Sequence, residues 1–460
     1  MRSTRLFPLL LRLLVAGAPA LQIFALPGTA IADDGGGNSG GDGGGSGSGG
    51  DGGQGFDGLP TTQPGRGLDE LFGRGGLFDR IFQGSPPARS PTPPRTAAPA
   101  TAASGEVIAF GLTQAQLGRL NTSGFGILAQ QDMAGAAVMA RLRVPQGLGT
   151  QAAIARIATL APGAAVAPNH YYRNQAGADD CTASICASWS QVGWRGAGQC
   201  GEELRIGVID TSPELAHPAL RGAQITTRRF VAGEASPSPG SGHGTAIVAI
   251  LAGASDSPAP GLLPGADILV ADPFIRGPGS DERADSFDLV RSLEHLAGSG
   301  VQAINLSLAG PENAVLRLSV ERVLQQGVAL VAAVGNAGPR AQPLYPAAYP
   351  GVIGVTAVDA AGQLYRRALR GTQVDFAAPG VRLPTASPPD GLRMQNGTSF
   401  ATPFITAAIS VLLAANPKLG PAEAERLLSN KARDLGKAGR DNSFGWGLFQ
   451  AMPHCETSAG

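Results

Sequence analysis

Five apolar runs recur along the chain after residue 200, and they constrain its fold more than any other feature. They span residues 206–209, 268–271, 301–308, 328–334 and 352–358. Nearly unbroken apolar runs of this length indicate strands that are buried on both faces, as in a parallel sheet. Helical patterns lie between them, with apolar faces at Leu289, Leu293 and Leu296 and again at Leu316, Val320 and Val323. The alternation predicts an α/β domain of three layers around a mostly parallel central sheet.

Polar residues stand at or near the carboxyl ends of these runs, at Asp210, Asn305 and Asn336. In open α/β sheets, ligands bind outside the carboxyl ends of the strands. The sequence therefore predicts a functional site at this edge of the sheet.

A segment with the sequence Gly-Thr-Ser-Phe-Ala-Thr-Pro, at 397–403, delivers Ser399 to the first turn of a predicted helix. Pro403 is tolerated near a helix start because the first N–H groups have no partners within the helix. The positive end of the helix would face whatever the serine attacks. Serine is a weak nucleophile unless a third group holds a base beside it. His243, in Gly-His-Gly-Thr at 242–245, and Asp210 are the candidates for base and orienting group.

These three motifs, in the order Asp210, His243, Ser399, resemble those of the subtilisin-like (subtilase) serine peptidases over roughly residues 200–450. The resemblance implies that Ser399 attacks a peptide carbonyl, that His243 takes and returns the proton, and that Asp210 orients the imidazole. A catalytically inactive binding or adhesion protein on the same fold is the alternative, but it would lack one of the three residues. An esterase or lipase is disfavoured because no Gly-x-Ser-x-Gly motif surrounds Ser399.

The remaining histidines lie outside such motifs: His170, His217, His295 and His454. His217 precedes a proline in the segment that follows Asp210, and we interpret it as a loop-packing residue rather than a base.

The resemblance also implies how substrate is held. Asn336 would stabilise the oxyanion together with the backbone N–H of Ser399. One strand would pair with the extended substrate and form a wall of the pocket for the residue before the cut, and its residues are Ser307, Leu308, Ala309 and Gly310. Leu344, before Tyr345 and Pro346, stands where the family commonly has glycine at the pocket floor, and Ala309 replaces a glycine of the wall. Both changes add bulk, so we predict a shallow pocket that prefers a small residue before the cut.

The N-terminus predicts export. Residues 1–32 combine three arginines, an apolar stretch to about residue 26 and an Ala-Ile-Ala cleavage signal at 30–32, which is typical of a signal peptide. A retained membrane anchor is the alternative, but Arg12 and Pro27 disfavour a spanning helix. The protein is therefore expected in a periplasm or outside the cell, with no stable membrane span.

Residues 33–104 read as a linker, first rich in glycine and then rich in proline. An apolar island at 66–83 interrupts it. The island could dock a partner or a membrane surface, or it could be a transient helix without a role.

Residues 105–175 predict a small α+β domain. A strand at 106–110 is followed by a helix with the capping-box pattern Thr113 to Gln116, strands at 126–128 and 138–144, a helix from Thr150 and a short strand at 165–166. The order β-α-β-β-α-β is the ferredoxin-like one. Its place before the catalytic domain (176–460) resembles that of the family's inhibitory propeptide, although an unrelated binding module would fit too. Because a leucine at the pocket floor should reject tyrosine, a maturation cut after Ala176 or Ala178 fits better than one after Tyr172.

Four cysteines, at Cys181, Cys186, Cys200 and Cys455, predict two disulfides in an exported chain. We favour the pairs Cys181–Cys186 and Cys200–Cys455. A zinc site is the rival interpretation, but the spacing fits no familiar ligand pattern.

Thirty-five basic and thirty-five acidic side chains cancel, so nothing indicates a nucleic-acid partner, and proteins or peptides are the expected substrates. No cofactor is identified. The family's Asn-rich calcium loop is not recognisable after the His243 motif, and the ligands of any structural calcium ion cannot be named. Ser212 replaces a family glycine two residues after Asp210, where a positive φ would strain a serine mildly.

Overall fold

The computed structural model describes residues 99–133, 135–174, 177–179, 186–194, 201–231, 239–278 and 281–451. The predicted signal peptide, the apolar island and most of the predicted linker lie outside these residues. So do Cys181, Cys200 and Cys455, together with the side chain of Cys186, and hence both predicted disulfides. The last three residues of the predicted linker, 102–104, belong instead to the first strand of the α+β domain.

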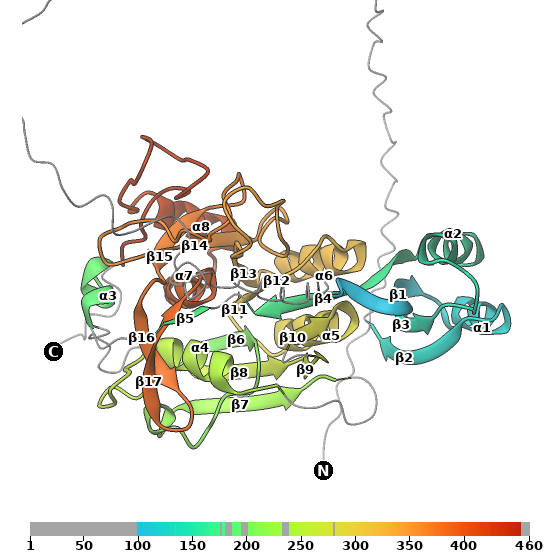
Figure 1. Cartoon of the computed structure of the whole chain (residues 1–460), viewed down its shortest axis with the longest axis horizontal. Coiled ribbons are helices and arrows are strands. Elements are labelled where there is room, and N and C mark those ends of the chain that lie inside the picture. Colours follow the sequence, from blue (N-terminus) through green and yellow to red (C-terminus); the bar gives the residue numbers. More distant parts are fainter. Residues whose placement is uncertain are drawn as a thin grey trace, which may run out of the picture. The chain divides into compact units, whose positions relative to one another are not determined.

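The core of the catalytic part is a sheet of seven strands, and every neighbouring pair in it is parallel. Their order is β15-β14-β13-β11-β6-β8-β7 (Figure 1). The strands are β6 (Arg205–Ile209), β7 (Gln224–Arg229), β8 (Asp267–Asp272), β11 (Ala303–Leu306), β13 (Ala329–Ala333), β14 (Ile353–Val358) and β15 (Phe376–Pro379). The apolar runs supply the five inner strands, so the predicted parallel sheet is confirmed.

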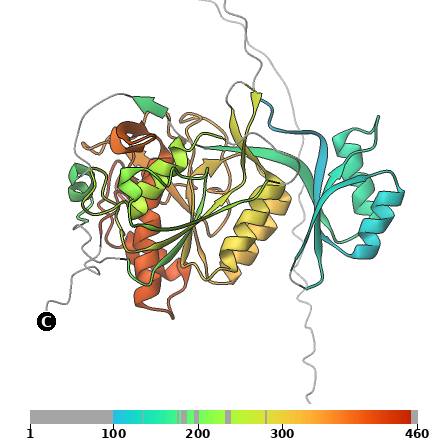
Figure 2. The same ribbon diagram turned by 90° about the horizontal axis from the view of Figure 1, so that it is seen from below.

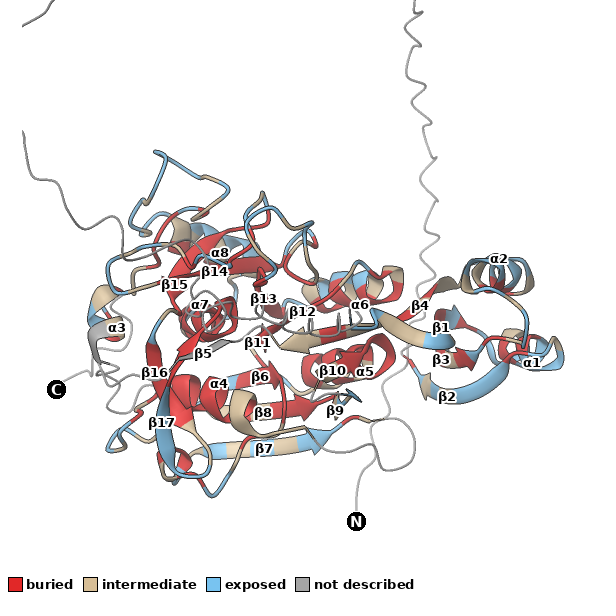
Figure 3. Cartoon of the chain, in the orientation of Figure 1, coloured by how far each residue is buried: buried red, intermediate tan, exposed pale blue. Residues whose placement is uncertain are grey.

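Helices cover both faces of this sheet, which confirms the three-layer architecture (Figure 2). On one face lie α4 (Gly242–Ala252), α7 (Thr398–Ala415) and α8 (Pro421–Ser429), whose apolar residues share a core with Ile206 and Val208 of β6. On the other lie α5 (Ser286–Ala297) and α6 (Ala314–Gln325), which share a second core with Ile304 and Leu306 of β11. Helix α7 is long and apolar enough to cross a membrane, but 83% of it is buried in the fold (Figure 3), as expected of a core helix.

The N-terminal α+β domain has the predicted order of elements. These are β1 (Ala102–Leu112), α1 (Gln114–Thr122), β2 (Gly126–Asp132), β3 (Val138–Arg143), α2 (Thr150–Leu160) and β4 (Ala165–Asn174), and the sheet order is β2-β3-β1-β4. The capping box of α1 is confirmed, because Thr113 and Gln116 each accept a hydrogen bond from the other's backbone N–H. Helix α2 begins at Thr150, as predicted, and Gly149 is its N-cap. In β3 the buried residues are Val138, Met139, Ala140 and Leu142.

Strand β4 is far longer than predicted, and its second half leaves the small domain. It runs antiparallel to β10 (Glu282–Asp285) and β12 (Leu308–Ala309) of the catalytic part. A short strand β9 (Phe274–Arg276) completes a hairpin with β10. Two residues further along the chain, β5 (Gly177–Asp179) pairs with β17 (Gly391–Asn396), which forms a hairpin with β16 (Leu383–Ser387). A single stretch of chain is thus paired with two separate parts of the catalytic domain.

Glu425 on α8 generates a prediction about stability and pH. Burial and the negative charge of Asp375 raise the pKa of the Glu425 carboxyl from 4.5 to about 7. A carboxyl that holds its proton more tightly in the folded chain stabilises the fold below its unfolded pKa. That contribution is lost as the pH rises through the folded pKa, here between 4.5 and about 7.

Glu425→Gln cannot titrate, so we expect its melting temperature to match the parent at about pH 5 and to exceed it at about pH 8. Both chains would carry Ser399→Ala to prevent self-digestion. Glu423→Gln, at an exposed position of the same helix, is the control and should show no such divergence. Parallel curves of melting temperature against pH for Glu425→Gln and its parent would contradict the assignment.

Candidate active site

The three predicted motifs meet at the carboxyl edge of the parallel sheet. Asp210 follows the last residue of β6 and is fully buried. His243 and Ser399 are the second residues of α4 and α7, two helices that pack together over the same face of the sheet (Figure 1). Each side chain therefore projects from the end of a rigid element rather than from a long loop.

Asp210 holds the imidazole of His243. Both carboxylate oxygens lie 2.8 Å from His243 Nδ1. One of them also accepts a hydrogen bond of 2.7 Å from the backbone N–H of Thr211, which fixes the carboxylate. Because an ionised carboxylate can only accept, Nδ1 carries the ring proton and Nε2 is left as the basic nitrogen. His243 Nε2 is buried and has no hydrogen-bond partner among the described residues.

The residues around this pair explain two features of the motifs. A Cβ at Gly244 would overlap the carbonyl oxygen of Thr211, so the residue after His243 must be glycine. Ser212 has no positive φ, so the predicted strain is absent. Its hydroxyl instead donates to Asp272 Oδ2 at 2.7 Å, at the end of the neighbouring strand β8.

Ser399 is tied to Ser307, the residue directly before β12, by two reciprocal hydrogen bonds. Its Oγ donates to the carbonyl of Ser307, and Ser307 Oγ donates to the carbonyl of Ser399, both at 2.9 Å. Pro403 is the sixth residue of α7 rather than a first-turn residue. It has no N–H to offer the Ser399 carbonyl, and Ser307 Oγ takes that place. The hydroxyl of Ser399 is not hydrogen-bonded to His243, a contact that often forms only when substrate is bound.

Asn336 lies beside the start of α7. Its Oδ1 accepts hydrogen bonds from the backbone N–H and the hydroxyl of Thr398, at 3.2 and 3.1 Å. A backbone N–H can only donate, so these bonds identify the oxygen and direct Nδ2 elsewhere. The side-chain amide of Asn336 and the backbone N–H of Ser399 thereby lie close to the positive end of one helix.

The predicted pocket residues gather around β12. Gly310 pairs with Tyr345 through two backbone hydrogen bonds of 2.9 Å, which brings the neighbouring Leu344 to this strand. Leu344 also packs on Gly335, where a Cβ would lie 2.7 Å from its Cδ1. Leu344 therefore lies near Gly335, which follows β13, and its neighbour Tyr345 pairs with Gly310, which follows β12.

The chain's own segment 171–174 occupies the edge of β12. Leu308 is the register partner of Asn174, and Ala309 that of Arg173. On the other side of the segment, Ala284 of β10 is opposite Tyr172. Tyr172 is fully buried, and its hydroxyl donates to the Pro311 carbonyl at 3.0 Å. The segment is an added strand between two strands of the catalytic part.

The same stretch of chain also pairs with a strand on the other side of Ser399. Gly177 is the register partner of Asn396, which lies three residues before Ser399. Asn174 on one side and Gly177 on the other are thus held by strands that flank the nucleophile, and only Gln175 and Ala176 separate them in sequence.

Polar contacts join the α+β domain to the starts of α5 and α6. Arg141 Nη1 lies 3.1 Å from Asp285 Oδ2, and Asn169 Nδ2 donates to the same oxygen at 3.2 Å. Asn313, the N-cap of α6, donates from Nδ2 to the Pro168 carbonyl at 3.0 Å. Sequence patterns did not single out these residues, because each partner lies far away along the chain.

The other described histidines do not approach Ser399 in any hydrogen bond. His217 accepts from Ala219 N–H at its Nδ1 and its Nε2 lies 3.1 Å from the Gly391 carbonyl, so loop packing is the role that the contacts support. His295 packs on Phe230. His454 lies outside the described residues.

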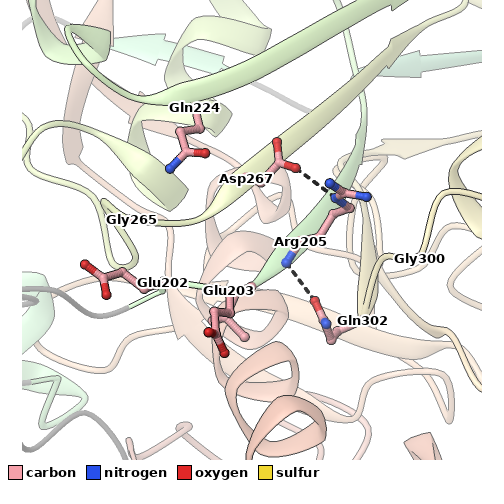
Figure 4. Close-up of a pocket in the computed structure, with 9 residues that line it drawn as sticks. Glu202, Glu203, Arg205, Gln224, Gly265, Asp267, Gly300 and Gln302 are labelled. Carbon is pink, nitrogen blue, oxygen red and sulfur yellow. Dashed lines mark hydrogen bonds and ion pairs between the residues drawn. The ribbon is translucent and has the colours of Figure 1, made fainter.

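A polar cavity of about 550 Å³ lies at the opposite edge of the sheet, where β6 and β8 begin (Figure 4). Glu202, Glu203 and Gln302 line it, with the ion pair between Arg205 and Asp267 at 2.8 Å. Asp210 stands at the other end of β6, so this cavity is not part of the site.

Comparisons with known proteins agree with the geometry. Residues 201–447 match the family described as the subtilase family. Subtilisin BL of Lederbergia lenta is 31% identical over 258 residues, which are 55% of this chain and 91% of that protein. Subtilisin DY of Bacillus licheniformis is 30% identical over 244 residues, which are 52% of this chain and 87% of that protein.

Among solved structures, fervidolysin from Fervidobacterium pennivorans, a keratinolytic enzyme related to subtilisin, aligns with a TM-score of 0.66 and 20% identity. The alignment covers 77% of this chain and 61% of that one, and it supports the fold alone. Together with the family match, the arrangement of Asp210, His243 and Ser399 leads to one conclusion. The chain belongs to the subtilase family, and it is a serine endopeptidase.

Proposed function

We propose that this chain is the exported, self-inhibited precursor of a serine endopeptidase that cuts its own N-terminal domain away. The observation that carries the proposal is a pairing on both sides of Ser399: residues 173–174 pair with β12, and residues 177–179 pair with β17. An extended peptide that adds to strand edges on both sides of a nucleophile is in the position of a substrate.

In the reaction, Ser399 Oγ attacks the peptide carbonyl and its proton passes to His243 Nε2. Asp210 holds the tautomer with Nδ1 protonated and stabilises the imidazolium that forms. The oxyanion receives hydrogen bonds from Asn336 Nδ2 and the Ser399 backbone N–H. Collapse of the intermediate gives the acyl-enzyme, with the His243 proton transferred to the leaving amine, and a water molecule then repeats the sequence on the ester.

The α+β domain acts as the inhibitor in this proposal. It is anchored by the contacts of Arg141 and Asn169 with Asp285 and of Pro168 with Asn313. These contacts hold strand β4 in the substrate cleft before and after the cut, so the product blocks the site until the domain is lost.

The same pairing narrows the maturation site to the bonds between Asn174 and Gly177. A cut after Ala176, one of the two sites favoured by the sequence, falls in this interval. A cut after Ala178 does not, because Ala178 is the register partner of Gln395 within β17. A cut after Gln175 is the further candidate that the interval contains.

The pocket before the cut is proposed to prefer small residues. Leu344 packs on Gly335 and lies next to the strand that carries Ala309. Both side chains take up space that glycine would leave open. Export is proposed from residues 1–32 alone, and extracellular or periplasmic release are equally consistent with it.

The proposed function generates three predictions, and the first of these concerns self-processing. Wild-type protein should lose its first 174 to 176 residues, whereas Ser399→Ala should lose only the signal peptide, because the second cut needs the nucleophile. Intact mass and N-terminal sequencing measure both. Triad loss should also lower peptide turnover by about 10⁶-fold. A Ser399→Ala chain that is trimmed at the same bond would show that another peptidase matures the protein.

The second prediction concerns Asn336. Asn336→Asp keeps an oxygen to accept from Thr398 but removes the amide donor. We expect kcat to fall by at least about 10²-fold, with KM little changed, because the lost bond acts on the oxyanion. A raised KM with an unchanged kcat would instead assign Asn336 to substrate binding.

The third prediction concerns Leu344. Leu344→Gly should deepen the pocket and raise the ratio of kcat/KM for Phe over Ala before the cut by about ten-fold or more. Leu344→Met, of similar volume, is the matched control and should leave the ratio near the wild-type value. A wild-type enzyme that already prefers Phe before the cut would refute the proposal that the pocket prefers small residues.

A further inference from the structure

The side chain of Arg173 is recognised by the catalytic domain in a way that backbone pairing does not require. Arg173 is the residue of β4 opposite Ala309. Its Nε lies 2.6 Å from Asp281 Oδ1 and its Nη2 lies 2.9 Å from Asp281 Oδ2. This is a two-bond fork between a guanidinium and a carboxylate, the geometry that distinguishes arginine from other side chains.

The pair is largely shielded from water. The side chains of Arg173 and Asp281 are 23% and 18% exposed. The Arg173 guanidinium lowers the pKa of the Asp281 carboxyl, so the carboxylate is ionised at neutral pH. A shielded, two-bond pair contributes more than an ordinary surface ion pair.

Asp281 is held in place by its own hairpin. It directly precedes β10, and its backbone carbonyl accepts from Gly277 N–H across the turn. Arg283 Nη1 lies 3.3 Å from Asp281 Oδ2, and the Arg283 guanidinium covers the ring of Tyr171 at 3.9 Å. Arg283 thus contacts Asp281 Oδ2, whereas Arg173 Nε binds Asp281 Oδ1.

Arg173 itself leaves with the N-terminal domain, together with one of its hydrogen-bond acceptors. Arg173 Nη2 also donates to the Ala100 carbonyl at 2.8 Å, and Ala100 leaves when the domain does. Asp281 belongs to the catalytic domain and remains after maturation. The carboxylate would then stand beside the substrate cleft, facing whichever side chain is opposite Ala309.

We propose that Asp281 is a specificity-determining residue that selects substrates with arginine, and less strongly lysine, at the position opposite Ala309. This rests on the proposed function, because it assumes that substrates pair with β12 as segment 171–174 does. If the cut falls after Gln175, the selected residue is the third before the scissile bond. Neutral side chains are accepted less well there, and acidic ones are disfavoured by Asp281.

The test uses mature wild-type enzyme and quenched fluorescent peptides that copy residues 171–179, with Arg, Lys, citrulline or Glu in place of Arg173. Citrulline keeps the shape of arginine and removes its charge. We expect kcat/KM for the Arg peptide to exceed that for the citrulline peptide by about ten-fold, and the ratio to shrink as salt is added. A ratio near one would overturn the proposal.

Variants test whether the preference for arginine comes from the Asp281 carboxylate or from the other charges of the protein. Asp281→Asn should bring the Arg-to-citrulline ratio close to one, and Asp281→Arg should favour the Glu peptide over the Arg peptide. Asp256→Asn, at an exposed acid beyond the far end of α4, is the matched control and should keep the wild-type ratio. A ratio that persists in Asp281→Asn would contradict the assignment even if the arginine preference itself is real.

Failure of the proposed function and failure of the specificity proposal give different results. Wild-type enzyme that cleaves neither these peptides nor casein would remove the proposed function. Wild-type enzyme that cleaves all four peptides equally would leave that function intact, and would show that Asp281 serves only to bind the N-terminal domain.

Discussion

The two hydrogen bonds between Ser307 and Ser399 connect the strand that binds an extended chain to the helix that carries the nucleophile. Pro403 makes the connection possible, because it leaves the Ser399 carbonyl without its partner inside α7. Ser307 is itself held by Asn305, whose Nδ2 donates to its Oγ at 2.8 Å. A shift of β12 would therefore move the nucleophile and the paired peptide together, so the distance between them would be kept.

The remaining parts of the site are built outward from this connection. Helix α7 supplies Ser399. It also contains Thr398, whose backbone N–H donates to Asn336 Oδ1 and so orients the Asn336 side chain. Strand β6 and helix α4 bring Asp210 and His243 from the neighbouring part of the parallel sheet. Residues 173–174 pair with β12 and residues 177–179 with β17, so in the proposed function the inhibitor and the first substrate are the same piece of chain.

The sequence predicted the parts of the molecule whose signal is local. The inner strands are continuous apolar runs, and Asp210, His243 and Ser399 each sit in a short motif. Strand β7 was missed because it is an edge strand with alternating exposed polar residues, and the second half of β4 because His-Tyr-Tyr-Arg-Asn has no period-2 apolar pattern. The pair Arg173–Asp281 joins residues 108 apart. No pattern within either segment indicates such a contact, because only the pairing of β4 with β10 and β12 brings them together.

The central claim is that the N-terminal domain, through strand β4, blocks Ser399 until the domain has been cut off and lost. It is tested most directly by the rate at which a fluorophosphonate labels Ser399, measured by mass spectrometry of the peptide that contains it. The comparison is between mature enzyme and a precursor with Ala176→Pro, a change meant to leave the triad intact while preventing the cut. The account predicts rapid labelling of the mature enzyme and much slower labelling of the uncut precursor. Equal labelling rates in the two proteins would contradict it.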